Sequence, residues 1–115
     1  MPSITDNSQI LATSSITIAS GQTTSGALNL HGNIICAIIA PIMTGTSLTF
    51  SVSFDGTTYY DYYDQYNSQP SIVVSSAARY IEIDEEDFVG AQYVKLISNA
   101  TEAAQRSFSI ITRPL

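Results

Sequence analysis

Apolar residues alternate with small polar ones along most of the chain, in short runs separated by turn-forming residues. The clearest run is Ser47 to Phe54, in which Leu, Phe, Val and Phe fall on one side of an extended chain and Ser or Thr on the other. A period of two is typical of a β-strand with one face in a core. We therefore expect the apolar side of this run, including Phe54, to face the core.

Similar runs recur about every ten residues, in nine candidate segments, and predict about eight strands in all. The segments are Ser14 to Ala19, Ala27 to Leu30, Ile34 to Ala40, Ser47 to Phe54, Thr58 to Tyr63, Ser71 to Ser75, Arg79 to Asp84, Gln92 to Ser98 and Ser107 to Arg113. Ile34 to Ala40 is apolar on both faces, as expected of a strand that is covered on both sides, and Pro41 ends its ladder.

Turn signals fix several connections between these segments. Asp55-Gly56 predicts a β-hairpin between the strands on either side of it. Acids at 84–87, followed by Phe88 and closed by Gly90, predict one helical turn, and a second helical turn competes at Asn99 to Gln105. No longer helix is expected.

Many short strands without helical crossovers indicate an all-β fold, an antiparallel β-sandwich or a jelly roll. Residues 1–13 are polar, with scattered Ile and Leu and no sustained period, so we expect an extended N-terminal arm. Residues 14–115 are then a single domain, since 115 residues are too few for two cores of ordinary size.

The composition shows that hydroxyl groups, more than charges, cover the surface. Charged residues make up 12% of the chain, against roughly 25% in an average soluble domain. Ser and Thr together account for 28 residues (16 Ser and 12 Thr). The net charge of −6 has the wrong sign for binding a phosphate backbone, so nucleic acid is not an expected partner.

Membrane and export signals are not evident in the sequence. The first ten residues, MPSITDNSQI, have no basic region followed by an apolar one, so no secretory signal is expected. The longest apolar stretch, Ile34 to Met43, is interrupted by Pro41 and is shorter than the roughly 18 residues that span a bilayer. The sequon at Asn99 is therefore interpreted as chance.

No pattern of catalytic, cofactor or metal-binding residues is found. The only histidine, His31, sits in a Gly-Asn turn and is expected to be a surface turn residue. The single cysteine, Cys36, lies in an apolar run and is expected in the core, and one Cys with one His is too few for a tetrahedral zinc site within the chain. We expect no enzyme and no cofactor.

Two segments are candidates for an interaction surface. Five tyrosines cluster within eight residues: Tyr59, Tyr60, Tyr62, Tyr63 and Tyr66. Because side chains alternate along a strand, the rings lie on both of its faces. Three roles for the tyrosines therefore stay open: packing in the core, a protein interface, or a platform on which sugars stack. The acidic run Asp84, Glu85, Glu86 and Asp87 is interpreted as a solvated loop, and it is where a cation would bind if one did.

A chain with positive mean hydropathy and few charges is expected to associate with copies or partners. The N-terminal arm, with Ile4, Ile10 and Leu11, and the C-terminal Thr112 to Leu115 would then clamp neighbouring subunits.

The residues also resemble a known group of proteins. An alternating strand ends in Ser53-Phe54-Asp55-Gly56-Thr57, and Tyr59-Tyr60-Asp61 and Arg79-Tyr80-Ile81 follow it. The later pattern is Phe88-x-Gly90-x-x-Tyr93-Val94-Lys95-Leu96, and the earlier one is Ala19 to Ser25 with Leu28 and Leu30. Together these resemble small β-rich virion proteins of tailed bacteriophages and prophages, over residues 16–112.

The resemblance implies a non-enzymatic virion structural protein, made in the host cytoplasm and placed on the capsid surface. A capsid decoration or cement protein is the first expectation, with the major capsid protein and copies of itself, as a trimer, for partners. A neck, tail or fibre-attachment component is an alternative within the virion. A glycan-binding β-sandwich that uses the five tyrosines is the alternative from a different class.

Overall fold

The computed structural model describes residues 11–74 and 77–114, and within these ranges the chain forms nine strands and no helix. The strands are β1 (Ala12–Ile18), β2 (Leu28–Asn29), β3 (Asn33–Ala40), β4 (Ser47–Ser53), β5 (Tyr60–Asp61), β6 (Ile72–Val73), β7 (Arg79–Glu82), β8 (Tyr93–Ser98) and β9 (Arg106–Pro114).

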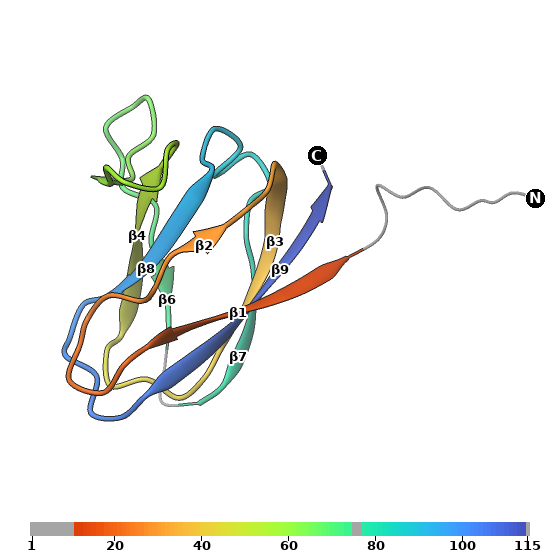
Figure 1. Ribbon diagram of the computed structural model, residues 1–115. Helices are drawn as coiled ribbons and strands as arrows, with labels where there is room; N and C mark the ends of the chain where they lie inside the picture. The colour runs from red at the N-terminus through yellow and green to blue at the C-terminus, as the bar shows by residue number, and fades with distance from the viewer. Residues whose placement is uncertain (1–10, 75–76, 115) are drawn as a thin grey trace, which may run out of the picture.

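Two antiparallel sheets pack face to face, which confirms the all-β sandwich (Figure 1). One sheet has the order β1-β9-β3-β7. The other has the order β2-β8-β4-β5, and β6 also pairs with β4. The chain changes sheet at every connection except β4–β5 and β5–β6, so strands far apart in sequence are neighbours, as β1 and β9 are.

The core lies between the sheets and is built from the inward residues of both. The first sheet supplies aliphatic residues such as Ile18, Ile38 and Ile110, and the second supplies Leu48 and Leu96, all of them fully buried. Apart from Ile38, whose strand is apolar on both faces, these are the apolar positions of alternating runs, so the period of two predicted which side chains point into the core. Phe50, Phe88 and Phe108 fill the largest volumes.

The Asp55-Gly56 hairpin is confirmed, with β4 and β5 paired at Ser51↔Asp61. The Asp55 carboxylate accepts the N–H groups of Thr57 and Thr58 at 2.8 and 3.0 Å, and Gly56 has a positive φ of 81°. The expectation that Phe54 faces the core is wrong, because β4 ends at Ser53 and the alternation stops there. The Phe54 side chain is 78% exposed.

The predicted core position of Cys36 is also wrong. The pairing of β3 with β9 shifts between Ile35 and Ala37, which is an irregularity of the β-bulge type. Cys36 is the extra residue there and is half-buried, with its Sγ atom 3.8 Å from a carboxylate oxygen of Glu85. Ile39 on the same strand is 38% exposed, so β3 is covered only in part on its outer face.

Neither expected helical turn forms. Residues 85–90 make successive hydrogen-bonded turns, with Asp87 N–H donating to the Asp84 carbonyl and Ala91 N–H to the Phe88 carbonyl. A φ of +67° at Phe88 breaks the helical path. Residues 99–105 are bends and irregular chain, held by long-range contacts that the sequence does not reveal.

The expected arm lies mostly outside the described residues, and Ile4 and Ile10 are among those outside. Ala12 and Thr13, which the sequence pattern places in the arm, belong to β1. His31 is exposed in a turn, as expected, with a φ of 54°. Among residues 11–74 and 77–114, no helix is long and apolar enough to cross a membrane.

Candidate functional site

The five clustered tyrosines have three different environments. Tyr62 turns inward, where its ring packs 4.8 Å from that of Phe88. Tyr59 is half-buried beneath the Lys95 ammonium, which lies 4.2 Å from the centre of the ring. Tyr60, Tyr63 and Tyr66 are exposed by 64%, 49% and 81%. Some of these tyrosines are therefore packed against other residues and some are exposed to solvent. The alternation of side chains does not continue past Asp61, because the strand ends there.

The four acids at 84–87 are divided in the same way. The Asp84 carboxylate accepts the Glu86 N–H at 3.0 Å and so closes the first turn. Glu85 turns away from the others to an ion pair with Arg113 at 2.6 Å. The Arg113 guanidinium, by hydrogen bonding, lowers the pKa of the Glu85 carboxyl. Glu85 therefore does not add its charge to the surface that the other three acids form.

A groove brings the rest of both segments together. It has a volume of about 690 Å³ and is open to solvent. Its lining combines tyrosine rings, carboxylates and a few small or amide groups: Tyr62, Tyr63, Asp64, Gln65, Tyr66, Asp84, Glu86, Asp87 and Gly90. We call this the acidic tyrosine groove. Of the other predicted interface residues, Tyr59, Tyr60 and Glu85 lie outside its lining, as does Leu11, which is 56% exposed.

The electrostatics of this groove favour positive charge. Burial raises the pKa of the Asp87 carboxyl, and the nearby carboxylates of Asp84, Asp64 and Glu86 raise it further. Among the residues that the structure describes, no Lys, Arg or His lines the groove to balance these acids. Within the described ranges, no three His, Cys, Asp or Glu side chains converge as a metal site. A cationic group spread over a larger surface, such as Lys or Arg side chains, fits the charge pattern best.

Tyr62, which lines the groove, is held in place by a partly buried hydrogen bond to the backbone of Phe88. The Tyr62 hydroxyl accepts the backbone N–H of Phe88 at 3.1 Å, and Phe88 is 2% exposed. The strained φ of Phe88 lets its ring reach the core, where it meets Phe50 edge-on at 4.8 Å. This bond therefore joins the tyrosine segment to the acidic segment.

Tyr62→Phe is expected to lower the free energy of unfolding by about 1–2 kcal/mol, because it leaves the partly buried N–H of Phe88 without its acceptor. Urea denaturation followed by circular dichroism measures the change. Tyr63→Phe is the matched control, since its exposed ring carries a solvated hydroxyl, and a change within about 0.5 kcal/mol is expected. Equal effects of the two variants would contradict the role of the Tyr62 hydroxyl.

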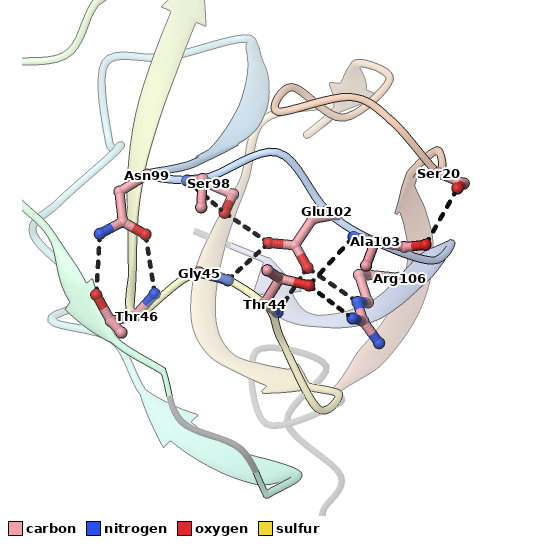
Figure 2. A network of polar contacts seen from close by, with 10 residues as sticks. Ser20, Thr44, Gly45, Thr46, Ser98, Asn99, Glu102, Ala103 and Arg106 are labelled. Carbon is pink, nitrogen blue, oxygen red and sulfur yellow. Dashed lines mark hydrogen bonds and ion pairs between the residues drawn. The ribbon is translucent and has the colours of Figure 1, made fainter.

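A second polar site, which sequence reasoning missed, surrounds Glu102. Its side chain is fully buried, and Figure 2 shows it surrounded by donors. One carboxylate oxygen accepts the Thr44 N–H at 2.8 Å and the Arg106 Nε–H at 2.9 Å. The other accepts the Gly45 N–H at 3.0 Å and the Ser98 hydroxyl at 2.7 Å. Four donors therefore satisfy this one buried charge.

These contacts hold three connections of the sandwich together. Glu102 lies in the β8–β9 connection, and Thr44 and Gly45 lie in the β3–β4 connection. The Glu102 N–H also donates to the Gln22 carbonyl of the β1–β2 connection at 3.0 Å. Asn99 adds to this network, since its side-chain oxygen accepts the Thr46 N–H at 2.8 Å (Figure 2). The sequon at Asn99 therefore coincides with a structural amide.

The only sequence signal for this network is the spacing Glu102 to Arg106. Glu and Arg four residues apart also fit a surface pair on a helix, and Asn99 to Gln105 was a candidate helical turn. The actual partners Thr44 and Gly45 lie 58 and 57 residues away in the chain. Sequence spacing cannot reveal such a pairing.

Stability is expected to fall as pH falls from about 4.5 to about 2. Hydrogen bonds from Ser98, Thr44, Gly45 and Arg106 outweigh burial and lower the pKa of Glu102 from 4.5 to about 2. A lowered folded-state pKa contributes stability above the unfolded-state value and loses it as pH falls through the folded-state value. The contribution is on the order of 3 kcal/mol, at 1.36 kcal/mol per pKa unit.

Urea unfolding at pH 6, 4, 3 and 2 measures this loss, and Glu102→Gln is the control because its side chain does not titrate. The difference between the two proteins should shrink as pH falls below about 4.5. A difference that stays constant down to pH 2 would contradict the assignment, since other acids titrate equally in both proteins.

Comparisons with protein-family models, with curated proteins and with solved structures found no significant match to this chain.

Proposed function

We propose that this chain is a non-enzymatic structural protein of a bacteriophage virion, a decoration or cement protein that docks on the capsid and stabilises it. The observation that carries the docking role is the exposure of large aromatic side chains along one short segment. Phe54, Tyr60 and Tyr66 are 78%, 64% and 81% exposed and lie within thirteen consecutive residues, 54–66. Tyrosine and phenylalanine are enriched at protein interfaces.

The acidic tyrosine groove supports a specific mode of docking. Rings on Tyr63 and Tyr66 offer apolar area with polar tips, and Asp64, Glu86 and Asp87 supply negative charge beside them. A basic segment on the capsid surface would complement this groove in both shape and charge. Because many copies bind one shell, a modest contact from each copy adds up to substantial stabilisation.

The order of the strands supports the virion assignment. Apart from β4, β5 and β6, which share a sheet, consecutive strands alternate between the β1-β9-β3-β7 sheet and the β2-β8-β4-β5 sheet, an interleaved order that agrees with a jelly roll. Jelly rolls are frequent in viral capsid domains and in lectins. Fold alone does not fix function, so the exposed aromatic surface carries the docking argument and the resemblance to phage virion proteins carries the location.

The test adds purified chain to virions from a phage in which the gene for this chain is deleted. We expect saturable binding at a fixed number of copies per particle. Tyr63→Ala combined with Tyr66→Ala should weaken the dissociation constant by roughly 30-fold, or about 2 kcal/mol, as for interface anchors. Tyr80→Ala is the matched control, because Tyr80 is 60% exposed on β7, outside the groove.

A second candidate function, glycan binding, is favoured by the same groove. Its lining places three tyrosine rings beside carboxylates and the amide of Gln65, and sugars stack on rings and bond to such acceptors. A glycan array separates the two functions. Binding to a defined glycan that Tyr66→Ala abolishes, together with no binding to virions, would replace the virion proposal.

A further inference from the structure

The edge strand β1 differs from the other sheet edges in length. In its own sheet the opposite edge is β7, with four residues, and in the second sheet β2, β5 and β6 have two residues each. β1 has seven residues and, among the strands of residues 11–74 and 77–114, pairs with β9 alone, without any shift in register. Short edge strands protect a sheet against pairing with other chains, and β1 lacks this protection.

Before Thr17, where the Gly26 N–H covers the edge, β1 also lacks the other common protective features. Its sequence, ATSSITI, contains no charged residue, no proline and no glycine. Edge strands in soluble proteins usually carry Lys, Pro or a bulge to prevent pairing with another strand. Thr13 and Ser15 are exposed, and small hydroxyl side chains place no obstacle beside the backbone.

The direction of the free backbone groups follows from two contacts of Thr17. Its carbonyl accepts the N–H of Gly26, which lies on the side away from β9. Its hydroxyl lies 3.3 Å from that of Ser107 on β9, a closeness typical of a non-hydrogen-bonded pair. Alternation along the strand then directs the N–H and C=O groups of Thr13 and Ser15 outward. Within the described residues these groups have no partner.

We infer that β1 is a self-association edge, on which a second copy of this chain adds its own β1 in antiparallel fashion. A two-fold axis at Ser14 places Thr13 of one copy opposite Ser15 of the other, and each residue of the pair then donates one hydrogen bond and accepts one. The two four-stranded sheets become one continuous sheet. An identical strand is self-complementary in this arrangement, which makes a two-fold dimer its natural product.

This pairing is independent of the acidic tyrosine groove, which is lined by residues of 62–66 and 84–90. It also adds to the proposed function, because a dimer joined through β1 would present two grooves to one shell. The geometry predicts a two-fold contact, in contrast to the trimer that the family resemblance implies.

Sedimentation velocity over a concentration series of the full chain provides the test. We expect a reversible monomer–dimer equilibrium for the native chain. Ser15→Pro removes an outward N–H, so it should weaken the dimer at least about tenfold and leave the urea midpoint almost unchanged. Ser14→Pro removes an N–H that bonds to β9, so it should lower the urea midpoint.

Two lysine variants distinguish association through the edge of the sheet from association through its outer face. Ser15→Lys places like charges close together across the two-fold axis, so the dimer should weaken at low salt and recover at high salt. Ser107→Lys adds the same charge on the outer face of β9, an internal strand, and should leave the dimer intact. A native chain that stays monomeric, or a dimer that Ser107→Lys weakens as much as Ser15→Lys, would overturn the inference.

Discussion

Glu102→Ala is expected to lower the free energy of unfolding by about 3–5 kcal/mol, because it leaves buried donors and the Arg106 guanidinium without their acceptor. Glu102→Gln should cost less, about 1.5–3 kcal/mol. Each carboxylate oxygen accepts two donors, so the amide NH₂ of Gln meets two donors whichever way it is oriented. Urea denaturation at neutral pH gives both values.

Glu85→Gln is the matched control for these variants. Glu85 also forms a close ion pair with an arginine, but its side chain is 47% exposed. Exposed ion pairs contribute about 0–1 kcal/mol, so the expected change is small. If Glu102→Ala cost no more than Glu85→Gln, the view that the Glu102 network holds three connections together would be wrong.

Phe88→Ala is expected to cost about 3–5 kcal/mol, because it removes a buried ring that packs on Phe50 and Tyr62. The backbone conformation of residue 88 also predicts how alanine and glycine at this position should compare in stability. At a φ of +67° an alanine remains strained, and glycine does not. Phe88→Gly should therefore be more stable than Phe88→Ala by about 1 kcal/mol, although both lose the ring.

This order is the reverse of the usual one, since glycine normally destabilises a regular element relative to alanine. Urea midpoints of the two variants, compared with each other, isolate the backbone contribution because the lost ring is common to both. A Phe88→Ala protein more stable than the Phe88→Gly protein would mean that residue 88 is not held in the left-handed region.

The strands were predictable because their signals are local. Alternation in Ser47 to Ser53 and the Asp55-Gly56 dipeptide each depend on neighbouring residues, and β4 and the hairpin follow from them. Exact ends were not predictable, since no local signal shows that β4 stops before Phe54. The bulge that moves Cys36 out of the core comes from register with β9, more than seventy residues later in the sequence.

The candidate site was predictable as two segments but not as one groove. The sequence singled out the tyrosines and the acids separately, and nothing local shows that Tyr66 and Glu86 line the same hollow. It also could not show that Tyr62 packs on Phe88 while it lines the groove, or that Glu85 lies outside the lining. In the Glu102 network, the side chains of Glu102 and Asn99 bind backbone amides that lie 53 to 58 residues away in the sequence, which explains why no local pattern revealed it.

The measurement that tests the proposed function most directly is the number of copies of this chain in purified virions, by quantitative mass spectrometry against the major capsid protein. A decoration protein should give about one chain per capsid chain, or another simple icosahedral fraction. A dozen copies or fewer would place the chain in the neck or tail and contradict the decoration role. Absence from the particles would contradict a virion role altogether.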